Sequence, residues 1–283
     1  MSERDFTIPF RQLPERFAEN LDRPAAEAAT PRPAATIVLL REGEGGLEVL
    51  LTQRVRTAAF VPGAYVFPGG RVDHDDGAAE LVSRLTGVSG EEARERLGLE
   101  AEADPSALAY YVAALREAFE ETGILVGRDG GGEPPPAASQ DEGVAALRRE
   151  LLGDEDAFPS ILDRMGCVMD GAVVEYVAHW ITPLAEPRRY DTRFFAALVP
   201  PGREPLIDPR EMSDALWITP EEALARNREG KLPMVFPTLR TLESLTGFLT
   251  PGGALDAFRG REIPALLPRL VRTEEGVSIE LER

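Results

Sequence analysis

Three glutamates, Glu117, Glu120 and Glu121, are spaced i, i+3 and i+4 in a segment that predicts a helix. At about 100° per residue this spacing places the three carboxylates on one helix face. Carboxylates held together repel one another, and a divalent cation would relieve the repulsion. Hard oxygen ligands of this kind suit Mg²⁺ or Mn²⁺. The spacing therefore allows a metal site, although a Glu-rich helix face is more often solvated surface.

The helix that must position these acids is predicted over residues 105–122. Asp104 provides an N-cap before a first-turn proline, and Gly123 provides the stop after the last turn. Arg116 precedes Glu120 by four residues, so the two side chains can pair. The opposite face is apolar and is expected to pack on a sheet through Leu108, Val112, Leu115 and Phe119.

The rest of the chain predicts an alternation of strands and helices. Short segments rich in β-branched and aromatic residues indicate strands at 35–42, 46–54, 65–70, 171–183, 189–200 and 215–219. Helices are predicted up to Leu97 behind the capping box of Ser89 and Glu92, and at 141–152, 158–165 and much of 219–248. The four glycines and three prolines of residues 127–139 predict an irregular surface loop.

The composition excludes several classes of protein. The 283 residues include 31 Lys and Arg against 49 Asp and Glu, a net charge of −18, which argues against a nucleic-acid partner. A single cysteine, Cys167, rules out an intramolecular disulfide and a cysteine-built zinc site. No apolar run reaches the roughly 18 residues of a membrane span. Because the N-terminus is also charged from its third residue, we expect no membrane partner and a cytoplasmic location.

The run Arg116–Ile124 is more specific than the three acids alone. It fits the pattern REUxEExGU, where U is aliphatic, with Ala118 at the first aliphatic place. That pattern is the second half of the Nudix box, so the sequence resembles the Nudix hydrolase superfamily. Residues 70–76 are similar to the first half, Gly-x5-Glu, with Asp76 in place of the glutamate.

The two halves of the box are separated by 39 residues, 77–115, where the pattern has seven. A box split in this way is similar to the Nudix subgroup typified by the animal peroxisomal acyl-CoA diphosphatase, whose members carry an extra segment inside the box. The phrases FPGGRVDHDD, RYDTRFFAALVP and FPTLRTL resemble the same subgroup. In all, the resemblance covers roughly residues 35–245.

The resemblance implies a mechanism in which a metal-activated water attacks one phosphorus of a nucleoside diphosphate derivative. A backbone carbonyl in the glycine loop before the box would also approach the metal. The implied roles are metal ligation by Glu117, Glu120, Glu121 and Gly69, catalysis by Glu120 and Glu121, a substrate contact at Gly70, and support from Arg116 and Asp76.

A second resemblance is to the coenzyme A signature of another Nudix subgroup, LLTxR[SA]x3Rx3Gx3FPGG. Residues 50–70 fall in register with it, except that Val55 replaces the small residue and Ala59 replaces the second arginine. The signature implies that Arg54 contacts substrate phosphate, with Arg56 as a second cation. The alternative, given equal weight, is that Arg54 is an exposed charge at the end of a strand.

Many Nudix proteins take a further carboxylate from a late loop, and Glu211 is predicted for that catalytic role because it lies six residues before Trp217. Its rivals are Glu175, Asp191 and Asp214. Additional phosphate contacts could come from Arg189, Arg193 and Arg203, although each is more readily a surface or structural residue. His74 is expected in a solvated loop and His179 within a strand, and two histidines cannot build a metal site alone.

These observations predict an α/β protein with a Nudix fold, a mixed β-sheet sandwiched between α-helices, with helical insertions. The expected organisation is an N-terminal arm and linker (1–34), a Nudix domain (35–250) with its box split as 70–76 and 116–124 by an insertion at 77–104, and a C-terminal extension packed on the domain (251–283).

The predicted function is hydrolysis of a small nucleotide diphosphate with Mg²⁺ or Mn²⁺, with CoA or acyl-CoA as the first candidate. One alternative is a diphosphatase for ADP-ribose, NADH or dinucleoside polyphosphates. Another is a non-catalytic Nudix-fold ligand sensor, which the intact set of acids disfavours. The resemblance alone also suggests a homodimer.

Overall fold

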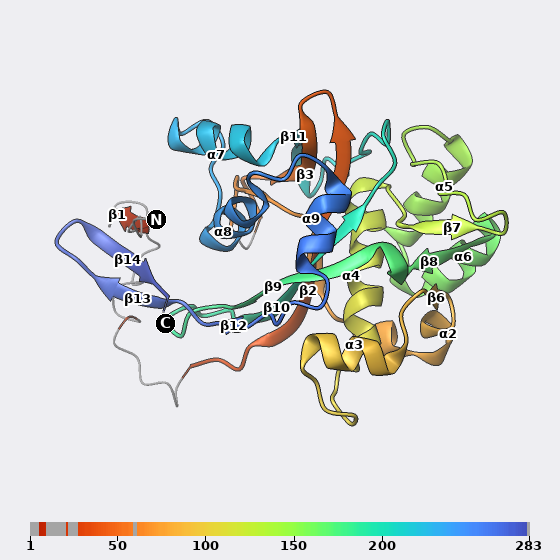
Figure 1. Ribbon diagram of the computed structural model, residues 1–283, viewed down its shortest axis with the longest axis horizontal. Helices are drawn as coiled ribbons and strands as arrows, with labels where there is room; N and C mark the ends of the chain where they lie inside the picture. Colours follow the sequence, from red (N-terminus) through yellow and green to blue (C-terminus); the bar gives the residue numbers. More distant parts are fainter. Residues whose placement is uncertain (1–5, 10–20, 22–27, 59–60, 282–283) are drawn as a thin grey trace.

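The computed structural model describes residues 6–9, 21, 28–58 and 61–281. Most of the predicted N-terminal arm and Ala59 fall outside these ranges. Figure 1 shows a central sheet with helices on both sides and a separate group of strands, β1, β13 and β14, at one end.

The strands are short apart from the four that form the centre of the sheet. In chain order they are β1 (Phe6–Pro9), β2 (Arg32–Gly43), β3 (Gly46–Arg54), β4 (Tyr65–Val66), β5 (Gly69–Arg71), β6 (Leu85–Thr86), β7 (Gly127–Asp129), β8 (Cys167–Asp170), β9 (Val174–Ile181), β10 (Tyr190–Leu198), β11 (Met212–Ile218), β12 (Ala265–Leu266), β13 (Arg269–Arg272) and β14 (Gly276–Glu280).

The helices lie in two groups, before and after the β9–β11 part of the chain. They are η3 (His74–Gly77), α2 (Ala79–Val82), α3 (Gly90–Leu97), α4 (Ala107–Thr122), α5 (Glu142–Leu151), η4 (Glu155–Ala157), α6 (Phe158–Met165), η5 (Gly171–Val173), α7 (Pro220–Arg228), α8 (Phe236–Leu245) and α9 (Pro251–Phe258).

The central sheet is mixed, as predicted. Its strand order is β11-β3-β2-β10-β9-β12, with β4 paired to β3 and β5 paired to β2. The β2–β3 hairpin turns between Gly43 and Gly46, while β2 and β10 run parallel. β2 begins at Arg32 rather than near Ala35, because residues 32–34 already pair with β10.

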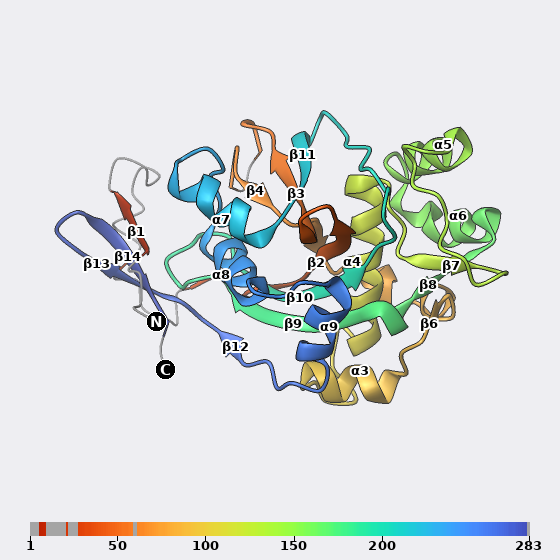
Figure 2. The same cartoon turned by 45° about the horizontal axis from the view of Figure 1, so that its top comes forward.

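Side chains along β2 alternate between two hydrophobic cores, since successive residues of a strand point to opposite faces. Ile37 and Leu39 enter the core that contains α4, whereas Val38 and Leu40 enter the core that contains α7, α8 and α9. Helices therefore cover both faces of the sheet, which confirms the predicted sandwich (Figures 1 and 2).

The helix that carries the acids differs from its prediction in two ways. It begins at Ala107, because Ser106 is the N-cap with an extended backbone (φ −63°, ψ 157°), so Asp104 and Pro105 precede it. It is also buried on almost every side rather than on one face. Besides β2, β5 and β10 of the sheet, the inserted elements α2 and α3 and the later α5 pack against α4.

Other differences concern short strands without a strong pattern of their own. β6, β7 and β8 form a small three-stranded sheet, so the predicted loop at 127–139 begins as a strand. The predicted strand 65–70 is divided into β4 and β5, which pair with different neighbours. The region after α9 contains β12, β13 and β14, so β11 is not the last strand. Within the described ranges, no helix is long and apolar enough to cross a membrane.

Phe119 anchors α4 in its core, where it is fully buried and its ring stacks on Phe158 with centroids 6.3 Å apart. We expect Phe119→Ala to lower the free energy of unfolding by about 3–5 kcal/mol, because it leaves a cavity. The matched control is Leu249→Ala, at a side chain 83% exposed, which should stay within about 0.5 kcal/mol of wild type. Urea unfolding measures both, and an unchanged midpoint for Phe119→Ala would contradict this account of the core.

Candidate active site

The acids of α4 open onto one small cavity of about 80 Å³. Glu117, Glu120 and Glu121 line it from α4, and Glu211 lines it from the turn before β11. The structure thus brings together the three glutamates spaced at i, i+3 and i+4 and the late-loop acid that the sequence favoured. The rest of the wall consists of Leu151 and Leu152 at the end of α5, together with Asp208 and Met212.

A buried ion pair joins the two halves of the split box. Arg116, 4% exposed, donates from Nε to Asp76 Oδ1 at 2.8 Å and from Nη2 to Asp76 Oδ2 at 3.0 Å. The Asp76 carboxylate, 1% exposed, also accepts from the Asp73 backbone N–H at 2.8 Å. The remaining nitrogen of Arg116, Nη1, reaches Glu117 Oε1 at 3.2 Å and Glu120 Oε1 at 3.0 Å. Arg116 therefore orients two of the three helix acids.

The glycine loop before the box fits closely against the same acids. A Cβ at Gly70 would lie 2.2 Å from Glu117 Oε1, and one at Gly69 would lie 2.5 Å from the carbonyl oxygen of Ala35. The Gly69 backbone N–H lies near enough to the Glu121 carboxyl to oppose the rise of its pKa. Because side chains are excluded at both positions, the loop backbone itself borders the acid cluster.

Burial dominates the electrostatics of the acids. It raises the pKa of Glu117 to about 8, and the charges of Glu120 and Asp76 add to the rise while Arg116 opposes it. Burial also raises the pKa of Glu121 well above its ordinary value, with Glu117 contributing and Arg54 opposing. Without a cation, the Glu117 and Glu121 carboxyls therefore keep their protons to a higher pH than an ordinary glutamate does.

The carboxylate oxygens that line the cavity are the type of ligand that a hard divalent cation prefers. Oε2 of Glu121 is buried without a hydrogen-bond partner among the described residues, and such an oxygen needs a proton or a cation. The acids line one cavity, yet nowhere in the described chain are three or more Asp, Glu, His or Cys side chains already gathered tightly enough to form a metal cage. The fit therefore rests on the oxygen donors of the cavity and on the buried Glu121 oxygen that no described residue satisfies.

Glu211 is held at the site by backbone contacts to the end of β3. Its carbonyl accepts from the Val55 N–H at 2.9 Å, and the next residue, Met212, pairs with Arg54. Its rivals are engaged elsewhere: Glu175 pairs with Arg96 and Arg259, Asp191 with His179 and Arg193, and Asp214 accepts from the Tyr65 hydroxyl.

The two arginines suggested by the coenzyme A signature differ in their placement. Arg54 is half-buried, its Nε has no hydrogen-bond partner among the described residues, and it lines a cavity of about 430 Å³ that Gly69 also lines. Arg56 is exposed in the turn after β3 and does not line that cavity. The structure thus brings Arg54, but not Arg56, next to the acids.

The remaining candidate residues make structural contacts. Arg189 donates to the carbonyls of Thr182 and Ala29, Arg193 stacks on Tyr110 while pairing with Asp191, and Arg203 bonds Gln140 and the carbonyl of Pro134. His74 is exposed beside Asp75, whereas His179 is buried in β9 against Asp191, as expected for both histidines.

Two residues of this region were not predicted. Asp208 is buried on the cavity wall and forms an ion pair with Arg210. Arg148 of α5 is buried and donates to the carbonyls of Phe119, Glu120 and Glu121 at 3.1, 2.8 and 3.3 Å. It satisfies acceptors that a helix end leaves free. Nothing in the sequence near α4 signals a cap supplied from 26 or more residues away.

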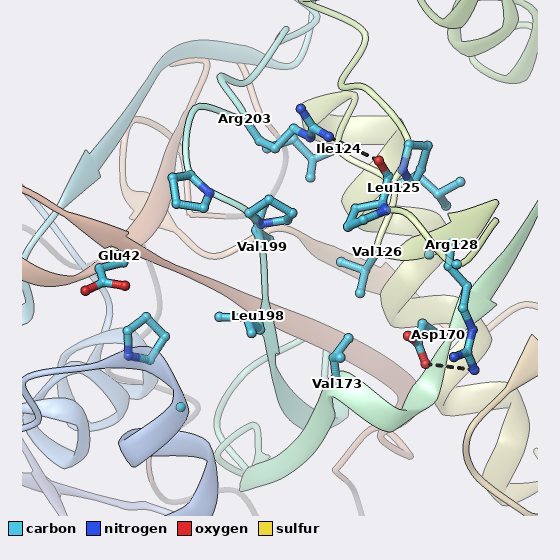
Figure 3. Close-up of a pocket in the computed structure, with 18 of the residues that line it drawn as sticks. Glu42, Ile124, Leu125, Val126, Arg128, Asp170, Val173, Leu198, Val199 and Arg203 are labelled. Carbon is cyan, nitrogen blue, oxygen red and sulfur yellow. Dashed lines mark hydrogen bonds and ion pairs between the residues drawn. The ribbon is translucent and has the colours of Figure 1, made fainter.

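A further cavity of about 420 Å³ lies apart from the acids (Figure 3). Figure 3 shows Leu198 and Val199 between Glu42 and the ion pair of Arg128 with Asp170. Neither the glutamates of α4 nor Glu211 lines this cavity, so it is not the candidate active site.

A mixed sheet between helices, with an acidic helix running beside a Pro-Gly-Gly loop, defines the Nudix class of hydrolases. Comparison with known proteins identifies a family within this class. A family model described as the NUDT19 Nudix domain matches residues 24–245. The chain therefore belongs to the NUDT19 Nudix domain family.

The similar proteins agree with this assignment. The chain is 30% identical over 237 residues to the acyl-coenzyme A diphosphatase NUDT19 of Gallus gallus, covering 71% of this chain and 61% of that protein. It is 27% identical over 267 residues to the protein of that name from Homo sapiens, covering 82% and 70%. The chain spans about three-fifths of the length of the first curated relatives that it matches. A crystal structure of a NUDIX hydrolase from Alicyclobacillus acidocaldarius gives a TM-score of 0.66 at 33% identity, covering 81% of this chain and 96% of that one.

The raised pKa of Glu117 predicts how stability depends on pH. Between its unfolded value near 4.3 and its folded value of about 8, the folded chain holds a proton that the unfolded chain has lost. The contribution of Glu117 to the free energy of unfolding is therefore greatest below about pH 4 and is lost as the pH rises toward 8. In EDTA we expect the melting temperature to fall from about pH 5.5 to pH 8.

Glu117→Gln is the matched control, because it keeps the shape of the side chain and removes its titration. Its melting temperature should fall less over the same pH range, and Mg²⁺ should raise the wild-type value more at the higher pH. A wild-type melting temperature that rises with pH, or equal falls in both proteins, would contradict the assignment.

Proposed function

We propose that this protein is a metal-dependent diphosphatase that hydrolyses the diphosphate of a nucleotide-containing substrate, most readily CoA or acyl-CoA. The observation that carries the proposal is the convergence of Glu117, Glu120, Glu121 and Glu211 on one cavity beside the Gly69–Gly70 loop. The family assignment and the names of the relatives support the same chemistry. With CoA, hydrolysis of the P–O–P bond would give adenosine 3′,5′-bisphosphate and phosphopantetheine.

Each residue has a role that its surroundings suggest. Glu117, Glu120 and Glu121 would hold Mg²⁺ or Mn²⁺, together with the carbonyl of Gly69. When bound, such an ion neutralises charge on the diphosphate and lowers the pKa of a water. Glu211 borders the cavity apart from α4 and can accept the proton of the attacking water.

The supporting residues fix these groups in place. Arg116 orients Glu117 and Glu120, and Asp76 in turn fixes Arg116. The Gly70 backbone, from which a side chain is excluded by Glu117, can approach a substrate phosphate closely.

A substrate panel tests the proposal directly. CoA, octanoyl-CoA, ADP-ribose, NADH and a dinucleoside polyphosphate are each incubated with Mg²⁺ or Mn²⁺, and the products are separated by chromatography. We expect turnover of CoA or its thioester with either cation and none in EDTA. A preference for ADP-ribose or NADH would support diphosphatase activity but contradict the assignment of CoA as substrate. No product from any substrate would reject the enzyme in favour of a ligand sensor.

Removing the charge of Glu120 or Glu121 should abolish most catalysis without unfolding the chain. We expect Glu120→Gln and Glu121→Gln each to lower kcat by several orders of magnitude, because a neutral amide is a poor ligand for a hard cation. Circular dichroism and a thermal melt check the fold. If both variants retain activity within about tenfold of wild type, a loss of about 1.4 kcal/mol, the metal-ligand roles are wrong.

Arg54 is the cation best placed to contact substrate phosphate. We expect CoA to be cleaved with a higher kcat/KM than dephospho-CoA, and Arg54→Ala to reduce that preference by about 1–3 kcal/mol, the scale of a charge-assisted hydrogen bond. Arg56→Ala, in the exposed turn, should change the ratio less. Equal kcat/KM values for the two substrates in the wild type would remove the basis for CoA specificity.

A further inference from the structure

A second and larger cavity adjoins the acid cluster. It has a volume of about 430 Å³, within the range of small-molecule sites, and its lining includes Gly69 and Arg54. The Gly69 backbone and the Arg54 charge both act on the Glu121 carboxyl, so these two residues border the candidate catalytic acids. A substrate held by the acids can therefore extend into this cavity.

The walls of the cavity are largely apolar. Aromatic rings of Phe67, Trp180, Phe194 and Phe236 form one side, and two of these rings, Trp180 and Phe236, meet edge to face at 5.7 Å. Among the described lining residues, Arg54 is the sole Lys, Arg or His, and Glu186 is the sole Asp or Glu. Burial raises the pKa of that carboxyl.

The far wall comes from the end of the chain, which is named here the C-terminal hairpin (β13 and β14, residues 269–280). Leu270, Val277 and Ile279 of the hairpin line the cavity, as does Ile8 of β1, which pairs with β14. Just before the hairpin, Leu266 of β12 pairs with Trp180 of β9. The hairpin lies beyond residues 24–245, the part that the family model matches.

We propose that this cavity binds the acylated end of the substrate's pantetheine arm, with the substrate's phosphate groups near Gly69 and Arg54 and the C-terminal hairpin covering the acyl chain. This inference rests on the proposed function. Charge selects this arm over the other half of the substrate, because the 3′-phosphate of the nucleotide requires cations and the walls beyond Arg54 offer none among the described residues. The apolar walls instead favour methylene groups.

The proposal predicts a dependence on acyl chain length. Each buried methylene contributes to binding, so kcat/KM should be at least about tenfold higher for octanoyl-CoA than for acetyl-CoA in the wild-type chain. Affinities for the two thioesters, measured by calorimetry in EDTA, should differ in the same direction. This second measurement does not require turnover.

Two variants change lining residues from different parts of the chain. Leu270→Asp places a charge on the hairpin wall, and Val235→Trp fills the cavity from the start of α8. Each should bring the octanoyl-to-acetyl ratio close to one, in both kcat/KM and affinity. The matched control, Leu267→Asp, adds the same charge at a side chain that is 41% exposed and does not line the cavity, and it should keep the wild-type ratio.

Three results would overturn the proposal. The first is a wild-type octanoyl-to-acetyl ratio near one in both kcat/KM and affinity. The second is an unchanged ratio in both wall variants. The third is an equal loss of affinity for both thioesters in these variants, which would mean that a part common to both, such as the nucleotide, occupies the cavity. Failure of the proposed function looks different. In that case no substrate is hydrolysed, yet the wild-type affinity ratio and its loss in the two wall variants would still support the acyl site.

Discussion

The arrangement of the candidate active site depends on one buried ion pair, between Arg116 and Asp76. Burying two charges costs several kcal/mol for each ion, and bidentate geometry is needed to offset that cost. Here both carboxylate oxygens are used, and the guanidinium also reaches Glu117 and Glu120. The pair connects segments that lie 40 residues apart. Together with the pairing of β5 on β2 and the packing of α4 on both strands, it fixes the glycine loop relative to the helix acids.

The same contact explains why an insertion inside the box is tolerated. The entropy of closing a loop grows only with the logarithm of its length, so 39 residues in place of seven add about 1.5 kcal/mol if the segment is flexible. The inserted chain is structured instead, and its helices pack on α4. That packing offsets the cost of the longer connection and helps to bury α4.

The sequence predicted those parts of the fold and site that depend on local pattern. Strand-forming residues predicted strands β2, β3, β9 and β10, and a capping box predicted the start of α3. Helical spacing predicted that Glu117, Glu120 and Glu121 would lie together. The sequence did not predict features that depend on contacts with residues far along the chain. β7 is a strand because β8 pairs with it, and α4 is buried all round because of elements far along the chain. Arg148, which caps α4 from α5, has no local signature at all.

The small sheet β1-β14-β13 joins the two ends of the described chain, since Phe6–Pro9 pairs with residues 276–279. The acid cluster is assembled from residues 69–212, but the larger cavity beside it is bounded by residues from near both ends. During synthesis, the residues of the acid cluster therefore emerge before those that complete the larger cavity. A growing chain could form the acidic centre before the hairpin exists, while the covered cavity requires the final strands to return to the first one. Removal of Phe6–Pro9 or of residues 276–279 would then disturb the same β-sheet.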